Sequence, residues 1–443
     1  MTVPKVELVE RPKLLNESET LTRTHWAILF FCLIGWLFDF YDLILYTFLV
    51  DPILADFGIA GNMLQGAAML ASSLVATAVG GISFGIISDR MGRKKALQWT
   101  IIIFSLGTFL SGLAPNVLFL IGALLITGFG VGGQWAVGQT MIGETWPAKW
   151  RGKAGAFMQT GVPIGVALAA IMGGFVTPIV GWRMTFFISA AAALIVIPIR
   201  GMMPESDLWL RNQELFAKGE IPEELKEKLG RSELSLLFDE KIRKAVFLGL
   251  MLAAFDMFAY WILFSWLPKY LKDNLSLGLQ LSGIWMIITQ VGAFIGYISF
   301  GYVSDLLGRR PAFTIFMLLQ AASVAALTIF ANWISSASRF GVELLLVPLF
   351  LMGIGTGAFS GYGPLFAEIF PTRLRNTAAG FCFNVARGAS AIAPILVALV
   401  AQDLGFGLAG GLALAIIFDI AVALWIWLFP ETKGKELNVC EYL

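Results

Sequence analysis

Long apolar segments alternate with short polar ones along almost the whole chain. A helix that crosses a bilayer needs about 20 mostly apolar residues, and twelve segments of the sequence reach that length. Six of them precede a polar stretch at residues 204–244, and six follow it. The pattern predicts an all-α membrane protein with twelve transmembrane helices in two six-helix bundles. The predicted spans are 26–50, 62–87, 96–114, 117–142, 154–177, 184–203, 245–270, 281–303, 311–331, 342–366, 377–401 and 406–429.

The polar stretches set the expected domains and orientation. Because basic loops stay in the cytoplasm, we expect both termini there, in a multi-pass protein of the plasma membrane. The basic loops lie at 90–95, 149–153, 309–310 and 373–375, with Arg183, Lys269, Lys272 and Arg339 as exceptions on the other side. The expected domains are a tail (1–25), the N-terminal bundle (26–203), a linker of short amphipathic helices (204–244), the C-terminal bundle (245–429) and a second tail (430–443).

Composition narrows the class of protein. Of 443 residues, 58% are hydrophobic and 14% are charged, and the mean hydropathy is +0.79. Lipid is therefore expected around most of the surface, because a soluble protein does not use so much apolar sequence. The net charge of +1 excludes a broadly basic nucleic-acid binder, and one His with three Cys leaves no metal constellation. The sequence carries no nucleophile or cofactor motif, so we expect neither a cofactor nor an enzyme.

The sequence repeats itself halfway. GIISDRMGRKKA begins at Gly85 and GYVSDLLGRRPA begins at Gly301, 216 residues later. A second pair has a spacing of 224 residues, since GETWPAKWRG begins at Gly143 and AEIFPTRLRN begins at Ala367. Each half then ends in Pro-Glu-Ser or Pro-Glu-Thr. A long apolar chain with such a repeat is typical of a transporter built from two like bundles.

These motifs resemble those of the major facilitator superfamily. The resemblance rests on the Gly-x-x-x-Asp-x-x-Gly-Arg-Lys/Arg loops after helices 2 and 8 and the Glu-x-x-Pro-x-x-x-Arg segments after helices 4 and 10. Asp39-x-x-Asp42 in helix 1 and Asn384-x-x-Arg387 in helix 11 are most similar to the carboxylate:proton symporters for lactate and sialate. Aromatic-acid and metabolite:proton symporters are close alternatives. The resemblance implies a central cavity that opens to each side in turn, and we expect a monomer.

Arg387 lies near the middle of the eleventh span. An Arg at the centre of a transmembrane helix costs about 2.5–3.5 kcal/mol on insertion scales, so a compensating partner is required. Its planar fork of donors suits a carboxylate, and we predict that Arg387 binds an anionic substrate. Asn384, one turn earlier on the same face, would bond a second polar group of that substrate. The alternative is a structural ion pair with Asp39, Asp42 or Asp256.

Asp39 and Asp42 are three residues apart in the first span and are expected to share a face of the helix. Two carboxylates this close in a low dielectric resist being ionised together. A symporter needs a group that loads and releases a proton and whose charge alters the affinity for an anion. We predict that one of the two is this group, with a helix–helix contact as the alternative. Asp256, at the matching position of the repeat, is the third candidate for proton coupling.

Gln134 follows two glycines in the fourth span, where the carboxylate symporters usually carry Glu. Gln keeps the shape of Glu and loses its titration, so proton coupling is expected elsewhere. Gln134 and Gln290 are candidates to bond substrate oxygens, with helix packing as the alternative. Four aromatic residues are candidates for the cavity wall, although aromatic side chains also pack between membrane helices. They are Tyr41, Tyr260, Trp261 and Tyr362.

The repeated loops are candidate gates. Acidic and basic residues at fixed positions would form ion pairs that close the cytoplasmic side while the other side is open. The alternative is that the basic residues only set the topology. The candidates are Asp89, Arg93, Glu144 and Arg151 in the first half and Asp305, Arg309, Glu368 and Arg375 in the second.

The sequence favours a secondary active transporter for proton-coupled symport of a small organic anion, above all a monocarboxylate, by alternating access. The expected partners are that anion, protons and the lipid bilayer, with no metal and no nucleic acid. Three alternatives stay open. A neutral sugar or polyol carrier would explain the Gln residues, and a drug:proton antiporter would match a Gly-Pro pattern that residues 161–165 fit in part. A non-transporting nutrient sensor would bind its ligand without moving it.

Overall fold

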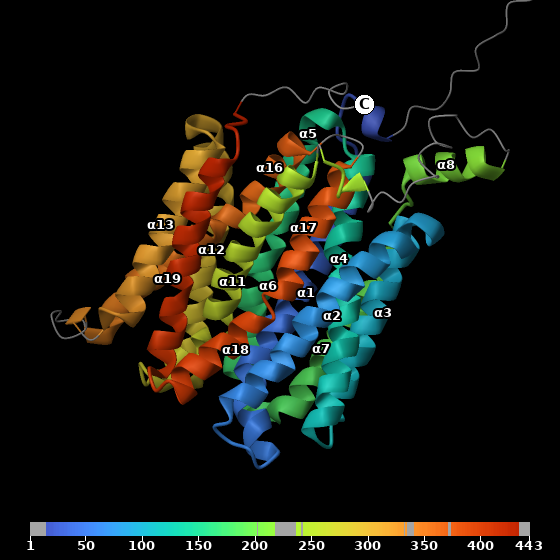
Figure 1. The fold of residues 1–443 in the computed structure, drawn as a ribbon. Coiled ribbons are helices and arrows are strands. Elements are labelled where there is room, and N and C mark those ends of the chain that lie inside the picture. The colour runs from blue at the N-terminus through green and yellow to red at the C-terminus, as the bar shows by residue number, and fades with distance from the viewer. Residues whose placement is uncertain are drawn as a thin grey trace, which may run out of the picture.

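The computed structural model describes residues 15–201, 203–217, 236–240, 242–331, 333–334, 341–370 and 374–433, and every regular element within them is a helix (Figure 1). The first half contains η1 (Leu15–Glu17), α1 (Arg23–Asp56), α2 (Met63–Met91), α3 (Arg93–Gly112), α4 (Val117–Thr145), α5 (Ala148–Gln159), α6 (Gly161–Ile171), η2 (Met172–Val176), α7 (Thr177–Gly201) and α8 (Asp207–Ala217). The second contains α11 (Arg243–Asp273), α12 (Gly278–Leu307), α13 (Arg309–Thr328), η3 (Gly341–Leu345), α15 (Leu346–Gly355), η4 (Thr356–Gly361), α16 (Tyr362–Ile369), α17 (Arg375–Ala389), α18 (Ile392–Ala398), η5 (Leu399–Asp403), α19 (Gly407–Trp425) and η6 (Ile426–Leu428). Parts of the predicted tails and linker, at 1–14, 218–235 and 434–443, lie outside the described residues.

The described helices make six spans in each half. Ten apolar helices of the described chain are long enough to cross a membrane. One of them, Lys153–Ala193, turns at Gly181, whose φ of +79° suits glycine, and so supplies two spans. The twelfth span is α3, which packs against both α4 and α7. The predicted arrangement of twelve helices in two bundles is confirmed.

Glycines let the helices of each bundle approach closely. A β-carbon on Gly132 of α4 would overlap the Thr77 carbonyl oxygen of α2, and one on Gly353 of α15 would overlap the Thr289 carbonyl oxygen of α12. Small residues at such crossings are how membrane helices gain packing contacts. The two bundles meet where α2 packs on α17 and α18, where α6 packs on α12, and where α1 touches α11. The interface between the bundles therefore runs through the middle of the molecule (Figure 1).

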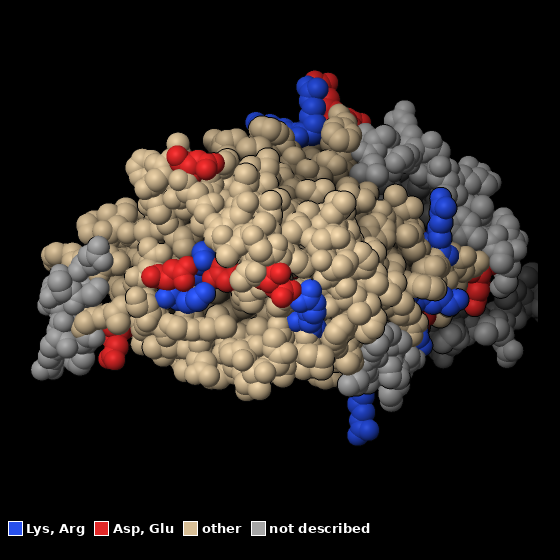
Figure 2. Space-filling view, turned by 90° about the horizontal axis from the view of Figure 1, so that it is seen from below, with Lys and Arg blue, Asp and Glu red and all other residues tan. Residues whose placement is uncertain are grey.

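Ion pairs join the two bundles at one end of the molecule, opposite to the loops around Asp89 and Asp305. We call the end with these loops the motif end. At the opposite end, Asp51 of α1 pairs with Lys269 and Lys272 of α11, each at 2.7 Å. In Figure 2, which views this opposite end, acidic and basic side chains form a row across an otherwise mostly uncharged face. The structure is therefore closed at the opposite end by contacts between the bundles.

Replacing Asp51 with Asn is expected to loosen this closure. Partly exposed ion pairs contribute about 0.2–1 kcal/mol each, so losing two of them should shift the population toward an opening at this end about fivefold. Spin labels on Ala60 and Asn274, both exposed, would report a larger fraction of long distances. Asp56→Asn is the matched control, because Asp56 pairs with Arg183 inside one bundle. Equal distance distributions in Asp51→Asn and wild type would contradict a closing role for Asp51.

Candidate functional site

An ion pair joins the two bundles at the centre of the molecule. Arg387 of α17 donates from Nη2 and Nη1 to the two carboxylate oxygens of Asp39 of α1, at 2.7 and 3.1 Å. Both side chains are 0% exposed. The bidentate geometry uses the planar fork of the guanidinium, which a Lys would not match. Among the pairings that the sequence left open for Arg387, this structure has the one with Asp39.

Aromatic rings surround this central pair. The guanidinium carbon of Arg387 lies 5.2 Å from the ring centroid of Phe40 and 5.5 Å from that of Trp36, within the range of a cation–π contact. Trp135 of α4 stacks on Phe383 of α17, with centroids 4.1 Å apart. Phe383 precedes Arg387 by one helical turn, so the stacked rings lie on the motif-end side of the ion pair. The central site is thus walled by rings from both bundles.

Asp42 and Tyr41 bond inside the first bundle. The Thr108 hydroxyl of α3 donates to Asp42 at 3.1 Å, and the hydroxyls of Tyr41 and Ser189 are 2.6 Å apart. The spacing of the two aspartates predicted that they share one face of the helix. In the structure Asp39 bonds across the interface and Asp42 bonds within its own bundle, which makes their environments different.

The three amide side chains predicted for the site differ in their hydrogen bonding. Gln134 donates to the Thr100 hydroxyl at 2.6 Å, a contact inside the first bundle that fits the packing alternative. Asn384 donates to its own helix at the Gly380 carbonyl oxygen, and its Oδ1 atom has no hydrogen-bond partner among the described residues. The Nε2 atom of Gln290 is likewise buried without a partner among them.

The candidate aromatic residues of the second bundle gather near the central pair. Tyr260 packs edge-on against Phe40, and Trp261 stacks parallel to the same ring. The Tyr260 hydroxyl and the Trp261 Nε1 are buried without a hydrogen-bond partner in the described chain. Tyr362 of α16 instead donates to the Leu252 carbonyl oxygen at 3.1 Å. Two polar atoms of α11, on rings that contact Phe40, therefore lack hydrogen-bond partners in the described chain.

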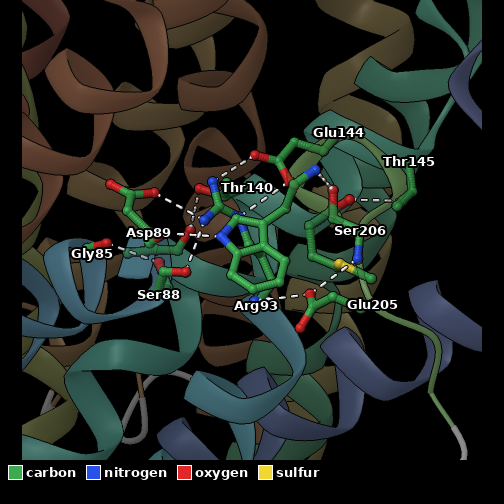
Figure 3. Close-up of polar contacts among 12 residues, drawn as sticks. Gly85, Ser88, Asp89, Arg93, Thr140, Glu144, Thr145, Glu205 and Ser206 are labelled. Carbon is green, nitrogen blue, oxygen red and sulfur yellow. Dashed lines mark hydrogen bonds and ion pairs between the residues drawn. The ribbon is translucent and has the colours of Figure 1, made fainter. Parts of the chain in front are cut away.

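Arg93 organises the motif end of the first bundle (Figure 3). Its Nη2 and Nε atoms donate to Glu144 of α4 at 2.7 and 3.1 Å, and its Nη1 lies 3.0 Å from Asp89 of α2. Arg93 therefore ties three helices of one bundle together. The side chain of Arg151, the fourth predicted member, lies outside the described part of the structure.

The second bundle repeats this arrangement. Arg309 donates to Glu368 at 2.8 and 3.2 Å and to Asp305 at 2.8 Å. The side chain of Arg375 lies outside the described part. The described ion pairs of these loops all form within one bundle, so each would stabilise its bundle as a rigid unit. Their action as gates stays a prediction.

Two glutamates that the sequence analysis gave no role cap the helices of these loops. Glu205 accepts from the first two backbone N–H groups of α3 at 2.9 and 3.1 Å, and Glu431 accepts from the first two of α13 at 2.8 and 3.1 Å. A carboxylate is favoured at a helix N-terminus. Partial burial acts to raise the pKa of Glu431, but four backbone N–H groups hold it below its ordinary value. The repeated Pro-Glu-Ser/Thr endings were the sequence signal for these caps.

Comparison with known proteins agrees with the fold. A model of the Major Facilitator Superfamily matches residues 31–342 and 246–439. A putative metabolite transport protein of Haemophilus influenzae is 31% identical over 415 residues, 93% of this chain and 98% of that protein. A sialic acid transporter of Escherichia coli is 30% identical over 381 residues, 86% and 88% of the two chains. A solved D-xylose–proton symporter has a TM-score of 0.72 at 24% identity, over 93% of this chain and 99% of that one. The chain is a multi-pass membrane transporter that belongs to the Major Facilitator Superfamily.

Proposed function

We propose that this transporter takes up a small organic anion, with monocarboxylates as the leading class, together with protons. The observation that carries the proposal is the bidentate pair between Asp39 and Arg387, which is fully buried between the two bundles. A charged residue inside a membrane protein is costly, and such residues mark ion and substrate pathways.

Arg387 is the residue that would hold the substrate. A substrate carboxylate has the same two oxygens as Asp39 and would make the same two charge-assisted hydrogen bonds. The substrate and Asp39 therefore compete for one guanidinium. Since Arg stays protonated in proteins, Arg387 keeps its charge through the cycle and needs one of the two anions at each stage.

Asp39 is the residue that would couple this exchange to a proton. When the substrate displaces it, Asp39 becomes an unpaired carboxylate in a dry site, which is far more costly than the neutral acid. Binding of the anion thus favours binding of a proton at Asp39, and by linkage the reverse also holds. After release of both, the Asp39–Arg387 pair forms again and the empty carrier can return.

The surroundings of Arg387 favour a short acid with a flat apolar part. Rings of Trp36 and Phe40 lie beside the guanidinium, and the unpartnered atoms of Tyr260, Trp261 and Asn384 supply polar contacts for further oxygens. The sialic acid transporter among the relatives moves a carboxylic acid, which supports an organic acid as the substrate but not its size or shape.

The charge distribution supports an orientation with the motif end in the cytoplasm. Arg93 and Arg309 lie at that end with other basic residues of the same loops, and basic loops remain cytoplasmic. Both ends of the described chain lie at this end (Figure 1). In this orientation the closed end around Asp51 is the outer one. The ion pairs of Arg93 and Arg309 at the motif end would hold each bundle rigid while the bundles rock.

Counterflow in proteoliposomes tests the proposed function. Proteoliposomes that contain the purified protein are loaded with an unlabelled monocarboxylate, aromatic acid or sugar, and entry of the labelled compound is followed. We expect counterflow with acids and not with sugars, and faster net uptake of the acid under an inward proton gradient. Counterflow of a neutral sugar at the same rate in wild type and in Arg387→Gln would overturn the proposal. So would acid uptake that ignores the proton gradient.

A further inference from the structure

The second bundle contains buried acceptor oxygens that lack donors. Asp256 of α11 and Asp419 of α19 are both 0% exposed. Neither oxygen of Asp256 has a hydrogen-bond partner among the described residues, and neither has Oδ2 of Asp419. The Nε2 atom of Gln320 on α13 donates to Oδ1 of Asp419 at 2.9 Å, and its own Oε1 is left without a donor. Buried acceptors are nearly always satisfied, so this group of side chains lacks at least one hydrogen-bond donor.

The two carboxyl groups lie on α11 and α19, which pack against each other. Phe258 and Phe418, which stack at 5.0 Å between centroids, hold α11 and α19 together at this level. No described Lys or Arg forms an ion pair with either carboxylate. An ionised carboxylate in such a place costs far more than the neutral acid, and two neighbouring carboxylates cannot both be ionised there.

The other titratable groups around Asp256 are phenols or are already paired. The Tyr362 hydroxyl of α16 is near Asp256, but its hydrogen bond goes to the Leu252 carbonyl oxygen at 3.1 Å. The charged residues that α17 and α1 contribute at the centre, Arg387 and Asp39, are bonded to each other. A proton on one carboxyl group would supply a missing donor and at the same time remove one negative charge.

We propose that Asp256, Asp419 and Gln320 form a second proton-binding site, separate from the Asp39–Arg387 pair. Gln320 already donates to Asp419 and fixes its orientation, so the acid form of Asp419 supplies a donor beside the unsatisfied Oε1 of Gln320. Asp256 is the second buried carboxyl group of the site. The site deepens the proton symport proposed above: if that function holds, the cycle moves a second proton with each anion.

Infrared spectroscopy of the purified full-length protein tests the site with the proton itself as the ligand. We expect a carbonyl band of a protonated carboxyl group that shifts in heavy water and disappears as the pH is raised. Asp419→Asn and Asp256→Asn should each abolish or shift this band. Asp51→Asn is the control and should leave it, because Asp51 is paired with two lysines. Gln320→Leu should shift the band without removing it.

Two results would overturn the second site. One is a wild-type spectrum in which no protonated carboxyl band depends on Asp256 or Asp419 at any pH. The other is a band that never loses its proton while the protein stays folded, which would make the pair a fixed structural contact. The test needs no substrate, so it separates failure of this site from failure of the proposed transport. With an anion that passes the counterflow test, the proton-to-anion ratio should fall from two to one in Asp419→Asn.

Discussion

Replacing Arg387 with Gln is expected to weaken binding of a carboxylate substrate about a hundredfold or more. Each hydrogen bond to a charged group is worth about 1.5–3 kcal/mol, and Arg387 would offer two of them, while about 1.4 kcal/mol corresponds to a factor of ten. Binding measured by tryptophan fluorescence or calorimetry, together with counterflow, would show the loss. The carboxylate affinity of Arg387→Lys should lie between those of wild type and Arg387→Gln, because Lys keeps the charge and loses the planar fork of donors.

The Arg387→Gln protein should nevertheless fold. Asp39, left without its partner, can take up a proton and become neutral. Arg243→Gln is a suitable control, since the ion pair of Arg243 with Glu240 is strongly exposed, and this variant should bind and transport as wild type does. Saturable carboxylate binding of unchanged affinity in a folded Arg387→Gln protein would remove this residue from the substrate site.

The fold was predictable because its signals are long and repeated. Twelve apolar segments need only length and composition, and the loops at Gly85 and Gly301 fix two equivalent halves. Boundaries were less predictable: the first helix is Arg23–Asp56 rather than 26–50, because helices extend beyond the apolar core into polar surroundings. The turn at Gly181 between two spans is a backbone feature, and composition does not specify it.

The site was predictable only in part. The sequence indicates how deep in the membrane a residue lies and on which face of its helix, but not which side chains it contacts. The pattern identified Arg387 and Asp39 and left their pairing open, whereas the direction of Asp42 toward Thr108 depends on helix packing. Lys269 and Lys272 stood out as basic residues on the wrong side, and their partner Asp51 became clear only when α1 and α11 were brought together.

The acceptor group at Asp419 escaped notice for a similar reason. One Asp in the last apolar span indicates little alone, and its meaning comes from neighbours on two other helices. Gln320 lies 99 residues earlier in the chain, and Asp256 earlier still. Contacts of this kind belong to tertiary structure.

Asp39→Asn is expected to have the larger effect on stability and to separate exchange from net uptake. It leaves Arg387 buried and unpaired, and a guanidinium cannot neutralise itself by losing a proton. Breaking a buried pair in this way costs about 3–5 kcal/mol, so the thermal midpoint of the empty protein should fall. A bound carboxylate would replace the missing partner, and we therefore expect a larger ligand-induced rise in that midpoint than in wild type.

Asp39→Asn should leave counterflow intact and abolish uphill uptake driven by an acid gradient. Counterflow needs only the substrate-loaded carrier, whereas net uptake requires the empty carrier to return with Arg387 neutralised by Asp39. The double variant Asp39→Asn/Arg387→Gln should recover stability, because no buried charge is left uncompensated there. Asp42→Asn is the matched control: it alters one hydrogen bond to Thr108, worth about 1 kcal/mol, and should keep uphill uptake. If Asp42→Asn loses proton-driven uptake while Asp39→Asn retains it, the coupling proton belongs to Asp42, and Asp39 serves only to hold Arg387.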